Sequence, residues 1–324
     1  MLKSDGLSIE GAMNQYTRLL VSLAVDEHRG EVLQKLRRLS GPESQVELFS
    51  CVYSAGLAGS HLFDAESRQH AVQAVLRKVE KGLISHVDKL QQQGISAGAD
   101  VYWDRDGAEG LVRKTLRYQP DLVVHAPEAH ANPLQQLLSA PDWRLLRQCP
   151  APLLLSKKPH WNDRPVIAAA IDPFHLDDEA AELDQRLLQH AAGLAQQLEG
   201  ELHVLHVFNT LPHSAIFDEH LVVDYEALQK KVRLEHHARI DELIAPYGLS
   251  VKDPCVHLLE GELHHLVPAW AEEKLVDVLV MGSLARGFID RLLLGSSAER
   301  LMDRVSCDLL VLKPDSFRCP VTEF

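Results

Sequence analysis

The sequence contains 324 residues, of which 46% are hydrophobic and 24% are charged, a composition typical of globular proteins and sufficient for two domains. Its 46 acidic and 33 basic residues give a formal net charge of −13. Such a surface repels phosphate backbones and anionic lipids, so we expect neither nucleic acid nor a membrane as a partner.

Five cysteines are scattered along the chain without the close, paired spacing of disulfide frameworks or zinc sites. This pattern predicts reduced thiols in a cytoplasmic protein. Residues 1–12 are polar and lack the apolar core of a signal peptide, and no stretch approaches 18 consecutive apolar residues. We therefore expect a soluble protein in which residues 1–12 form a loosely packed extension.

Along the first half of the chain, short leucine-rich or β-branched runs predict buried parallel strands. Between the strands at 46–52 and 120–127, a long stretch has apolar residues spaced by three and four, typical of an amphipathic helix. Gly94 follows this stretch and predicts its C-terminal cap. The last strand of this half is expected in "APLLLSKK", residues 151–158.

The second half repeats the same series of elements. The strands expected at 165–172, 201–207, 276–282 and 307–314 match those of the first half with offsets between 146 and 156 residues. A second long helix ends before Gly248. The repeat predicts two domains, residues 1–158 and 159–324, joined by a linker at 156–165. Since helices alternate with strands in each copy, we expect two doubly wound α/β domains.

The stretch "VMGSLARGFIDRLLLGSS" predicts an anion site. Ligands of open α/β sheets collect beyond the carboxyl ends of the strands, where Gly282 allows close backbone approach. Gly295, Ser296 and Ser297 then open a helix whose N–H groups and hydroxyls can hold phosphates, and Arg286 adds positive charge. The alternative is that Gly282 only makes a turn and that the serines only cap a helix.

The same stretch resembles the signature G-x-x-G-x9-G-[ST] of the universal stress protein family. The segments "RLLLGSSAER", "AAIDP" and "CDLLVLKP" also match, and the resemblance covers both copies. It implies a tandem-type member with Rossmann-like, five-stranded parallel sheets in the order 3-2-1-4-5. Some members bind ATP or AMP, so the resemblance implies such a nucleotide as a ligand.

The resemblance also implies roles for individual residues in the second copy. Asp172 would contact adenosine, Val207 would contact adenine through its backbone, and Gly282 would lie beside the ribose. Gly295, Ser296 and Ser297 would hold the phosphates. The chain departs from the signature at one position, because Ala285 stands where the signature has its second glycine. The added methyl group would narrow the phosphate loop, so whether this copy binds a nucleotide stays an open question.

In the first copy the corresponding residues contain no glycine. An offset of 156 places Ala126, Ala129, Ser139 and Ala140 at the positions of Gly282, Ala285, Gly295 and Ser296. We interpret this copy as having lost its nucleotide site, so that it serves as a packing partner or as a differently tuned pocket.

The 18 histidines include the adjacent pairs His236-His237 and His264-His265. Neighbouring residues on a helix point about 100° apart, so we expect solvated or capping histidines and no metal site. Catalytic motifs such as H-E-x-x-H and G-x-S-x-G are missing, and no nucleophile with a base and an orienting group stands out. We therefore expect no dedicated enzyme, with slow incidental ATP hydrolysis at most.

The sequence favours a cytoplasmic stress-response regulatory protein that binds ATP or AMP in its second copy. The alternative is a nucleotide-independent scaffold or small-ligand carrier, and a nucleotidyl-transfer enzyme ranks below both. A protein partner and a homodimer stay open.

The last strand of each copy would form an exposed apolar sheet edge, which must be covered or paired. We therefore predict an internal pseudo-dimer in which these strands pair antiparallel. Leu153, Leu155, Leu309 and Val311 would be buried there. The alternative is two separate domains on a flexible linker.

Overall fold

The computed structural model describes residues 16–23, 29–59, 64–127, 138–174, 178–209, 225–283 and 296–322. The expected extension at residues 1–12 lies outside these ranges. The elements of the first half are β1 (Arg18–Ser22), α1 (Arg29–Leu39), β2 (Gln45–Val52), α2 (Ala55–Ala58), α3 (Ala65–Gln91), β3 (Ser96–Trp103), α4 (Gly107–Tyr118), β4 (Leu122–His125), α5 (Ala140–Gln148) and β5 (Leu153–Leu155). Those of the second half are β6 (Val166–Ala170), α6 (Asp178–Gln197), β7 (Glu201–Phe208), α7 (Tyr225–Ile244), the 3-10 turn η2 (Ala245–Tyr247), β8 (Val256–Glu260), α8 (Leu263–Glu273), β9 (Val276–Gly282), α9 (Ser296–Arg304) and β10 (Asp308–Leu312). None of the described helices is long and apolar enough to cross a bilayer.

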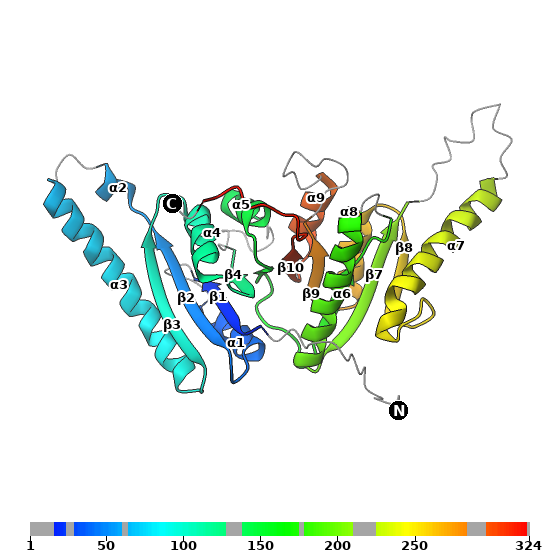
Figure 1. Ribbon diagram of the computed structural model, residues 1–324, viewed down its shortest axis with the longest axis horizontal. Helices are drawn as coiled ribbons and strands as arrows, with labels where there is room; N and C mark the ends of the chain where they lie inside the picture. Colours follow the sequence, from blue (N-terminus) through cyan, green and yellow to red (C-terminus); the bar gives the residue numbers. More distant parts are fainter. Residues whose placement is uncertain are drawn as a thin grey trace.

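All ten strands belong to one sheet, in the order β3-β2-β1-β4-β5-β10-β9-β6-β7-β8 (Figure 1). Within each half the pairing is parallel and the order is 3-2-1-4-5, as expected. The two expected five-stranded sheets are therefore joined into a single mixed sheet. The two long helices end as predicted, because Gly94 and Gly248 both adopt the positive φ of a helix C-terminus.

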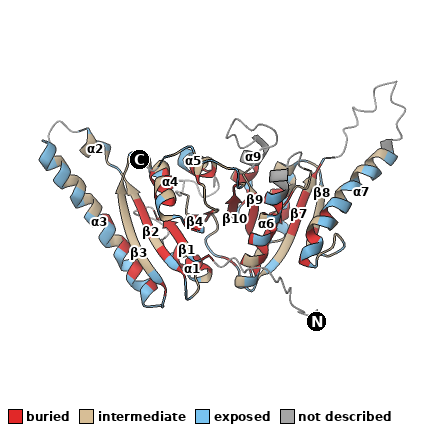
Figure 2. Cartoon of the chain, viewed as in Figure 1, coloured by how far each residue is buried: buried red, intermediate tan, exposed pale blue. Residues whose placement is uncertain are grey.

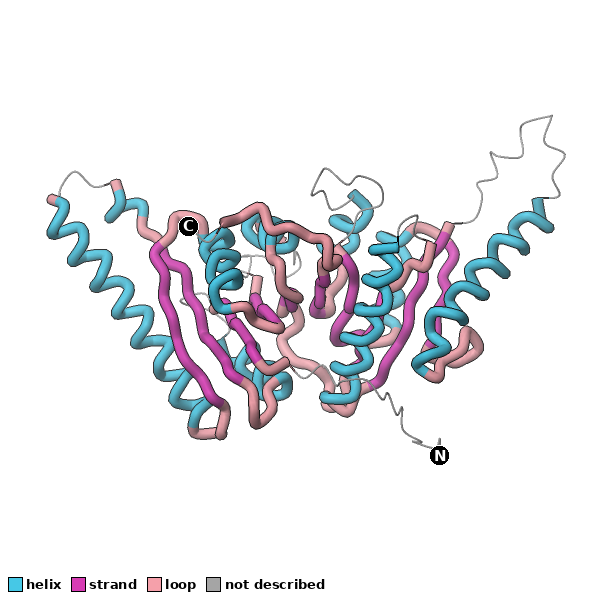
Figure 3. The backbone as a smooth tube through the Cα atoms, viewed as in Figure 1, coloured by secondary structure: helices cyan, strands magenta, loops and turns pink. Residues whose placement is uncertain are grey.

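Helices cover both faces of this sheet, and each face has a core that spans the two halves (Figures 2 and 3). Leucines of α1, α3 and α6 pack on one face, together with Ile240 and Ile244 of α7. Buried residues of α4, α5, α8 and α9 pack on the other. Since strands such as β4, β9 and β10 are buried on both faces, their sequences are mostly apolar, apart from Asp277 in β9 and Asp308 in β10.

The two halves meet where β5 pairs antiparallel with β10, a contact that we call the seam. Leu154 lies opposite Leu310, its own counterpart at an offset of 310 − 154 = 156 residues, so the pairing is symmetric. Leu155 lies opposite Leu309, and Leu153 opposite Val311; all are at most 2% exposed. The predicted internal pseudo-dimer is confirmed, and separate domains on a flexible linker are not.

Two lysines reinforce the seam by crossing it in opposite directions. Lys157 donates to the carbonyl of Met302 at the end of α9 (2.7 Å), and Lys313 donates to that of Leu146 at the end of α5 (2.5 Å). The two lysines are again 156 residues apart, so each half caps the last helix of the other. Helix C-termini carry unpaired carbonyls and partial negative charge, which an ammonium group satisfies. Burial lowers the pKa of Lys313 to about 8.

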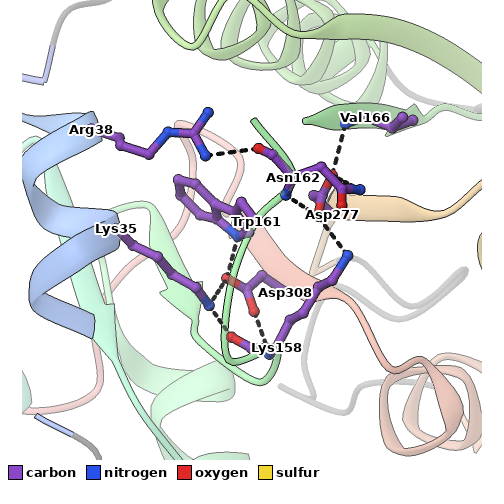
Figure 4. A network of polar contacts seen from close by, with 8 residues as sticks. All are labelled: Lys35, Arg38, Lys158, Trp161, Asn162, Val166, Asp277 and Asp308. Atoms are coloured by element: carbon purple, nitrogen blue, oxygen red, sulfur yellow. Dashed lines mark hydrogen bonds and ion pairs between the residues drawn. The ribbon is translucent and has the colours of Figure 1, made fainter. Parts of the chain in front are cut away.

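The connection at residues 156–165 is held in place by hydrogen bonds to two buried carboxylates (Figure 4). Asp308 accepts hydrogen bonds from Lys35 (2.6 Å), from the backbone N–H of Lys158 (2.7 Å) and from the indole of Trp161 (2.8 Å). Asp277 accepts from the ammonium group of Lys158 at 2.5 Å. The predicted linker is thus a packed part of the interface between the halves.

We predict that Lys313→Met destabilises the protein by about 1–3 kcal/mol, because the buried carbonyls at the end of α5 lose their donor. Methionine keeps most of the apolar volume, so the change isolates the ammonium group. Urea denaturation measures the loss. The control is Lys89→Met, at an exposed lysine in the last turn of α3. Equal stability of the two variants would show that the crossed lysines do not stabilise the seam.

Candidate functional site

The candidate site of the second half lies at the carboxyl ends of β6, β7 and β9. Asp172 follows β6, Val207 is the penultimate residue of β7, and Gly282 ends β9. Since β6 lies between β7 and β9 in the sheet, these residues share one edge. Helix α9 begins at Ser296, directly after Gly295, as the motif predicts. Ala285, Arg286 and Gly295 lie outside the described residues, as do the side chains of Ser296 and Ser297.

At Val207, strand β7 extends beyond its neighbour β6. The pairing between the two strands ends at Ala170 and Leu205, after which the N–H of Ile171 donates to the carbonyl of Leu205 (3.0 Å). On its other side Val207 still pairs with Leu259 of β8. The backbone of Val207 that faces β6 therefore lies past the end of that strand, where a ligand can approach it.

Asp172 and Gly282 also have local structural roles. The N–H of Asp172 donates to the buried carboxylate of Asp184 on α6 (3.2 Å), and its own Oδ1 accepts from the N–H of Phe174 (3.3 Å). A Cβ at position 282 would lie 2.8 Å from Leu183 Cδ2, so glycine leaves room here for the Leu183 side chain of α6. The alternative interpretation, in which Gly282 is a structural residue, is thus supported by its packing against Leu183.

Next to these residues lies a cluster that we did not predict, formed by Phe174, His206, Phe208 and His236. His206 is fully buried, and its Nδ1 lies 3.0 Å from the carbonyl oxygen of Ile171. Its Nε2 lies 2.8 Å from Nδ1 of His236 on α7. We call these four residues the histidine–phenylalanine cluster.

The imidazole of His236 is the centre of this cluster. Its ring centroid lies 3.9 Å from that of Phe174 and 4.2 Å from that of Phe208. The guanidinium of Arg239, one helical turn further along α7, lies 4.6 Å from the Phe174 ring. His236 is therefore half-buried among aromatic rings, whereas the adjacent His237 is exposed as expected.

On the opposite face of the sheet, the two halves use the same three positions differently. In the first half, Lys114 of α4 bridges two carboxylates of β2 and β3. In the second half, the corresponding positions hold Trp270 of α8 and the imidazoles of His203 and His257, whose Nδ1 and Nε2 lie 2.9 Å apart. A partly buried ion triad in the first half thus corresponds to a stack of rings in the second half.

In the first half, a carboxylate of the protein lies at the helix N-terminus that corresponds to the predicted anion site of the second half. The Asp142 carboxylate, on the first turn of α5, accepts from the N–H and the hydroxyl of Ser139 (both 2.7 Å) and lies 2.9 Å from Nε2 of His125. These bonds lower its pKa although burial opposes its charge. With the offset of 156, Ser139 corresponds to Gly295 and Asp142 to Ala298. A carboxylate of the chain itself thus sits at the N-terminus of α5.

Among the described residues, one group has the spacing of metal ligands: Glu262, His264 and His265, whose ligand atoms lie within 4.8 Å of one another. The Arg304 guanidinium donates to Nδ1 of His265 at 3.3 Å. Its positive charge opposes a bound cation. The absence of a metal site stays a prediction.

Comparison with known proteins finds similarity to one family. The model of the universal stress protein family matches residues 176–313. Universal stress protein E of Escherichia coli is 23% identical over 319 residues, covering 95% of this chain and 98% of its own. Over nearly its whole length the chain is thus similar to universal stress protein E, and most of its second half matches the model of the family. The universal stress protein E homolog of Haemophilus influenzae is 24% identical, with 93% of both chains covered. The crystal structure of a functionally unknown protein from Pseudomonas aeruginosa has the same fold, with a TM-score of 0.73, 24% identity and 94% of both chains covered.

The lowered pKa values of two histidines predict that the free energy of unfolding decreases in acid. Burial, and then the nearby charge of His203, lower the pKa of His257 from 6.5 to about 4, and burial does the same to His190. The unfolded chain binds these protons more readily, so the stabilisation is complete above about pH 6.5 and is lost as pH falls towards 4. We predict that His257→Gln reduces the fall in melting temperature between pH 7 and pH 5.

The matched control is His237→Gln, which replaces an exposed histidine and should keep the pH dependence of the wild type. An unchanged pH dependence in His257→Gln would contradict the assignment.

Proposed function

We propose that the chain is a cytoplasmic stress-response regulatory protein that binds ATP or AMP at the carboxyl edge of its second half. Asp172, Val207 and Gly282 meet there beside the start of α9, and some members of the family bind ATP. The described residues at this edge supply rings and a turn carboxylate but no nucleophile paired with a base. The proposed role is therefore binding rather than catalysis.

The observation that carries this proposal is the difference between the N-termini of α5 and α9. At α5 the N-terminus is occupied by the Asp142 carboxylate, which would repel a phosphate. At α9 the sequence places Gly295 and two serines, and Ala298 stands where the first half has Asp142. Backbone N–H groups and the helix dipole at such a terminus favour a phosphate. We infer that nucleotide binds in the second half alone.

The runner-up function is a scaffold or small-ligand carrier that needs no nucleotide. It is favoured by the structural roles of Gly282, which makes room for Leu183, and of Asp172, which forms a turn. Binding measurements separate the two functions.

We predict that Gly295→Asp abolishes ATP binding by the full-length chain, because it places a negative side chain at the phosphate edge. Isothermal titration calorimetry measures the affinity. The matched control is Ser139→Asn at the corresponding position of the first half, where asparagine remains a good helix cap and adds no charge beside Asp142. The halves are not tested separately, because cutting the chain exposes the buried seam.

Full affinity in Gly295→Asp would contradict the assignment to the second half. If the wild-type chain binds neither ATP nor AMP at millimolar concentration, the nucleotide-independent function is favoured instead.

A further inference from the structure

The histidine–phenylalanine cluster adjoins the proposed nucleotide site. His206 and Phe208 flank Val207 in β7, and Phe174 closes the turn that begins at Asp172. The rings of the cluster therefore lie beside the backbone that the proposed function assigns to the adenine.

His236 has the properties of a bound heteroaromatic base. It is a flat, nitrogen-containing ring held against two phenyl groups at 3.9 and 4.2 Å, and it hydrogen-bonds a buried partner. Aromatic stacking with one or two polar contacts is how proteins hold nucleobases. We propose that the imidazole of His236 occupies the base position of the second half and must leave it before a nucleotide can bind. This inference rests on the proposed function.

The hydrogen bonds define what can replace His236. A carbonyl oxygen only accepts, so Nδ1 of His206 must donate to Ile171, and Nε2 of neutral His206 is an acceptor. With His206 neutral, His236 pairs with this acceptor by donating from its Nδ1. The amino group of adenine can donate in the same way. Hypoxanthine has a carbonyl oxygen in place of the amino group of adenine. A base of this kind leaves Nε2 of His206 without a hydrogen-bond donor, which lowers its affinity.

Helix α7 is built so that its N-terminal part can move. Its buried residues, among those described, are Ile240 and Ile244 near its C-terminus, and Leu234 is 60% exposed (Figure 2). Before His236, Arg233 pairs with Glu260 at 2.8 Å, but both side chains are partly exposed and such pairs contribute little. Between residues 226 and 239 no side chain of α7 is buried, and His236 shares its inward face with the half-buried Leu228 and Val232.

Calorimetry on the full-length chain tests the proposal with ATP as the probe. We expect His236→Ala to bind ATP at least about fivefold more tightly than the wild type, because no occupant has to be displaced. His237→Ala, the matched control at the adjacent exposed histidine, should keep the wild-type affinity. ITP should bind His236→Ala at least about fivefold more weakly than ATP does.

Equal or weaker ATP binding by His236→Ala than by the wild type would overturn the proposal and leave the proposed nucleotide function standing. If neither protein binds ATP at millimolar concentration, the proposed function fails and this inference fails with it. Equal affinities for ATP and ITP would overturn the role given to His206.

A second measurement uses the wild-type chain and does not depend on a variant. In nitrogen-15 NMR of the histidine side chains, the signal of the hydrogen bond between His206 and His236 should disappear on saturation with ATP. Its persistence in the saturated complex would overturn the proposal.

Discussion

The antiparallel pairing of β5 with β10 is the constraint on which the rest of the structure depends. Each strand is the last of its half, is apolar, and would be an exposed edge alone. Because Leu154 faces its counterpart Leu310, both halves contribute the same surface, as in a twofold homodimer. The crossed lysines and the carboxylates around the connection then supply hydrogen-bond partners from each half to buried polar groups of the other. Neither half has all of its helix ends and buried charges satisfied without its partner.

Within this symmetric framework the two halves have diverged at matching positions. In the first half, polar residues bond to one another: Asp142 caps α5, and Lys114 bridges two carboxylates. The second half places histidines and aromatic rings at the comparable strands, and it has alanine where Asp142 would be. Under the proposed function, duplication of this kind lets one copy lose its ligand site while the other keeps one.

The sequence predicted those features that depend on local pattern or on simple geometric rules. Apolar runs located the strands, glycines located the ends of the long helices, and the problem of an exposed apolar edge predicted the seam. The capping of α5 also had a readable signal, since Ser139 and Asp142 have the spacing of a capping box. Lys157 and Lys313 were not predicted, because their partners are 145 and 167 residues away and lie on the other half.

The histidine–phenylalanine cluster was also missed, for a similar reason. Its members come from a turn, a strand and a helix, and only the packing of α7 beside β7 brings His236 against both phenyl rings. The packing role of Gly282 depends on how closely α6 approaches, which no motif encodes. The roles of Ala285, Arg286 and Gly295 stay predictions.

The central claim is that one half of a symmetric framework binds nucleotide and the other half has filled its own site. Native mass spectrometry of the full-length chain with increasing ATP counts the bound molecules directly. The account predicts a complex with one ATP per chain that saturates without a second addition. Two ATP molecules per chain, or none at millimolar concentration, would contradict it.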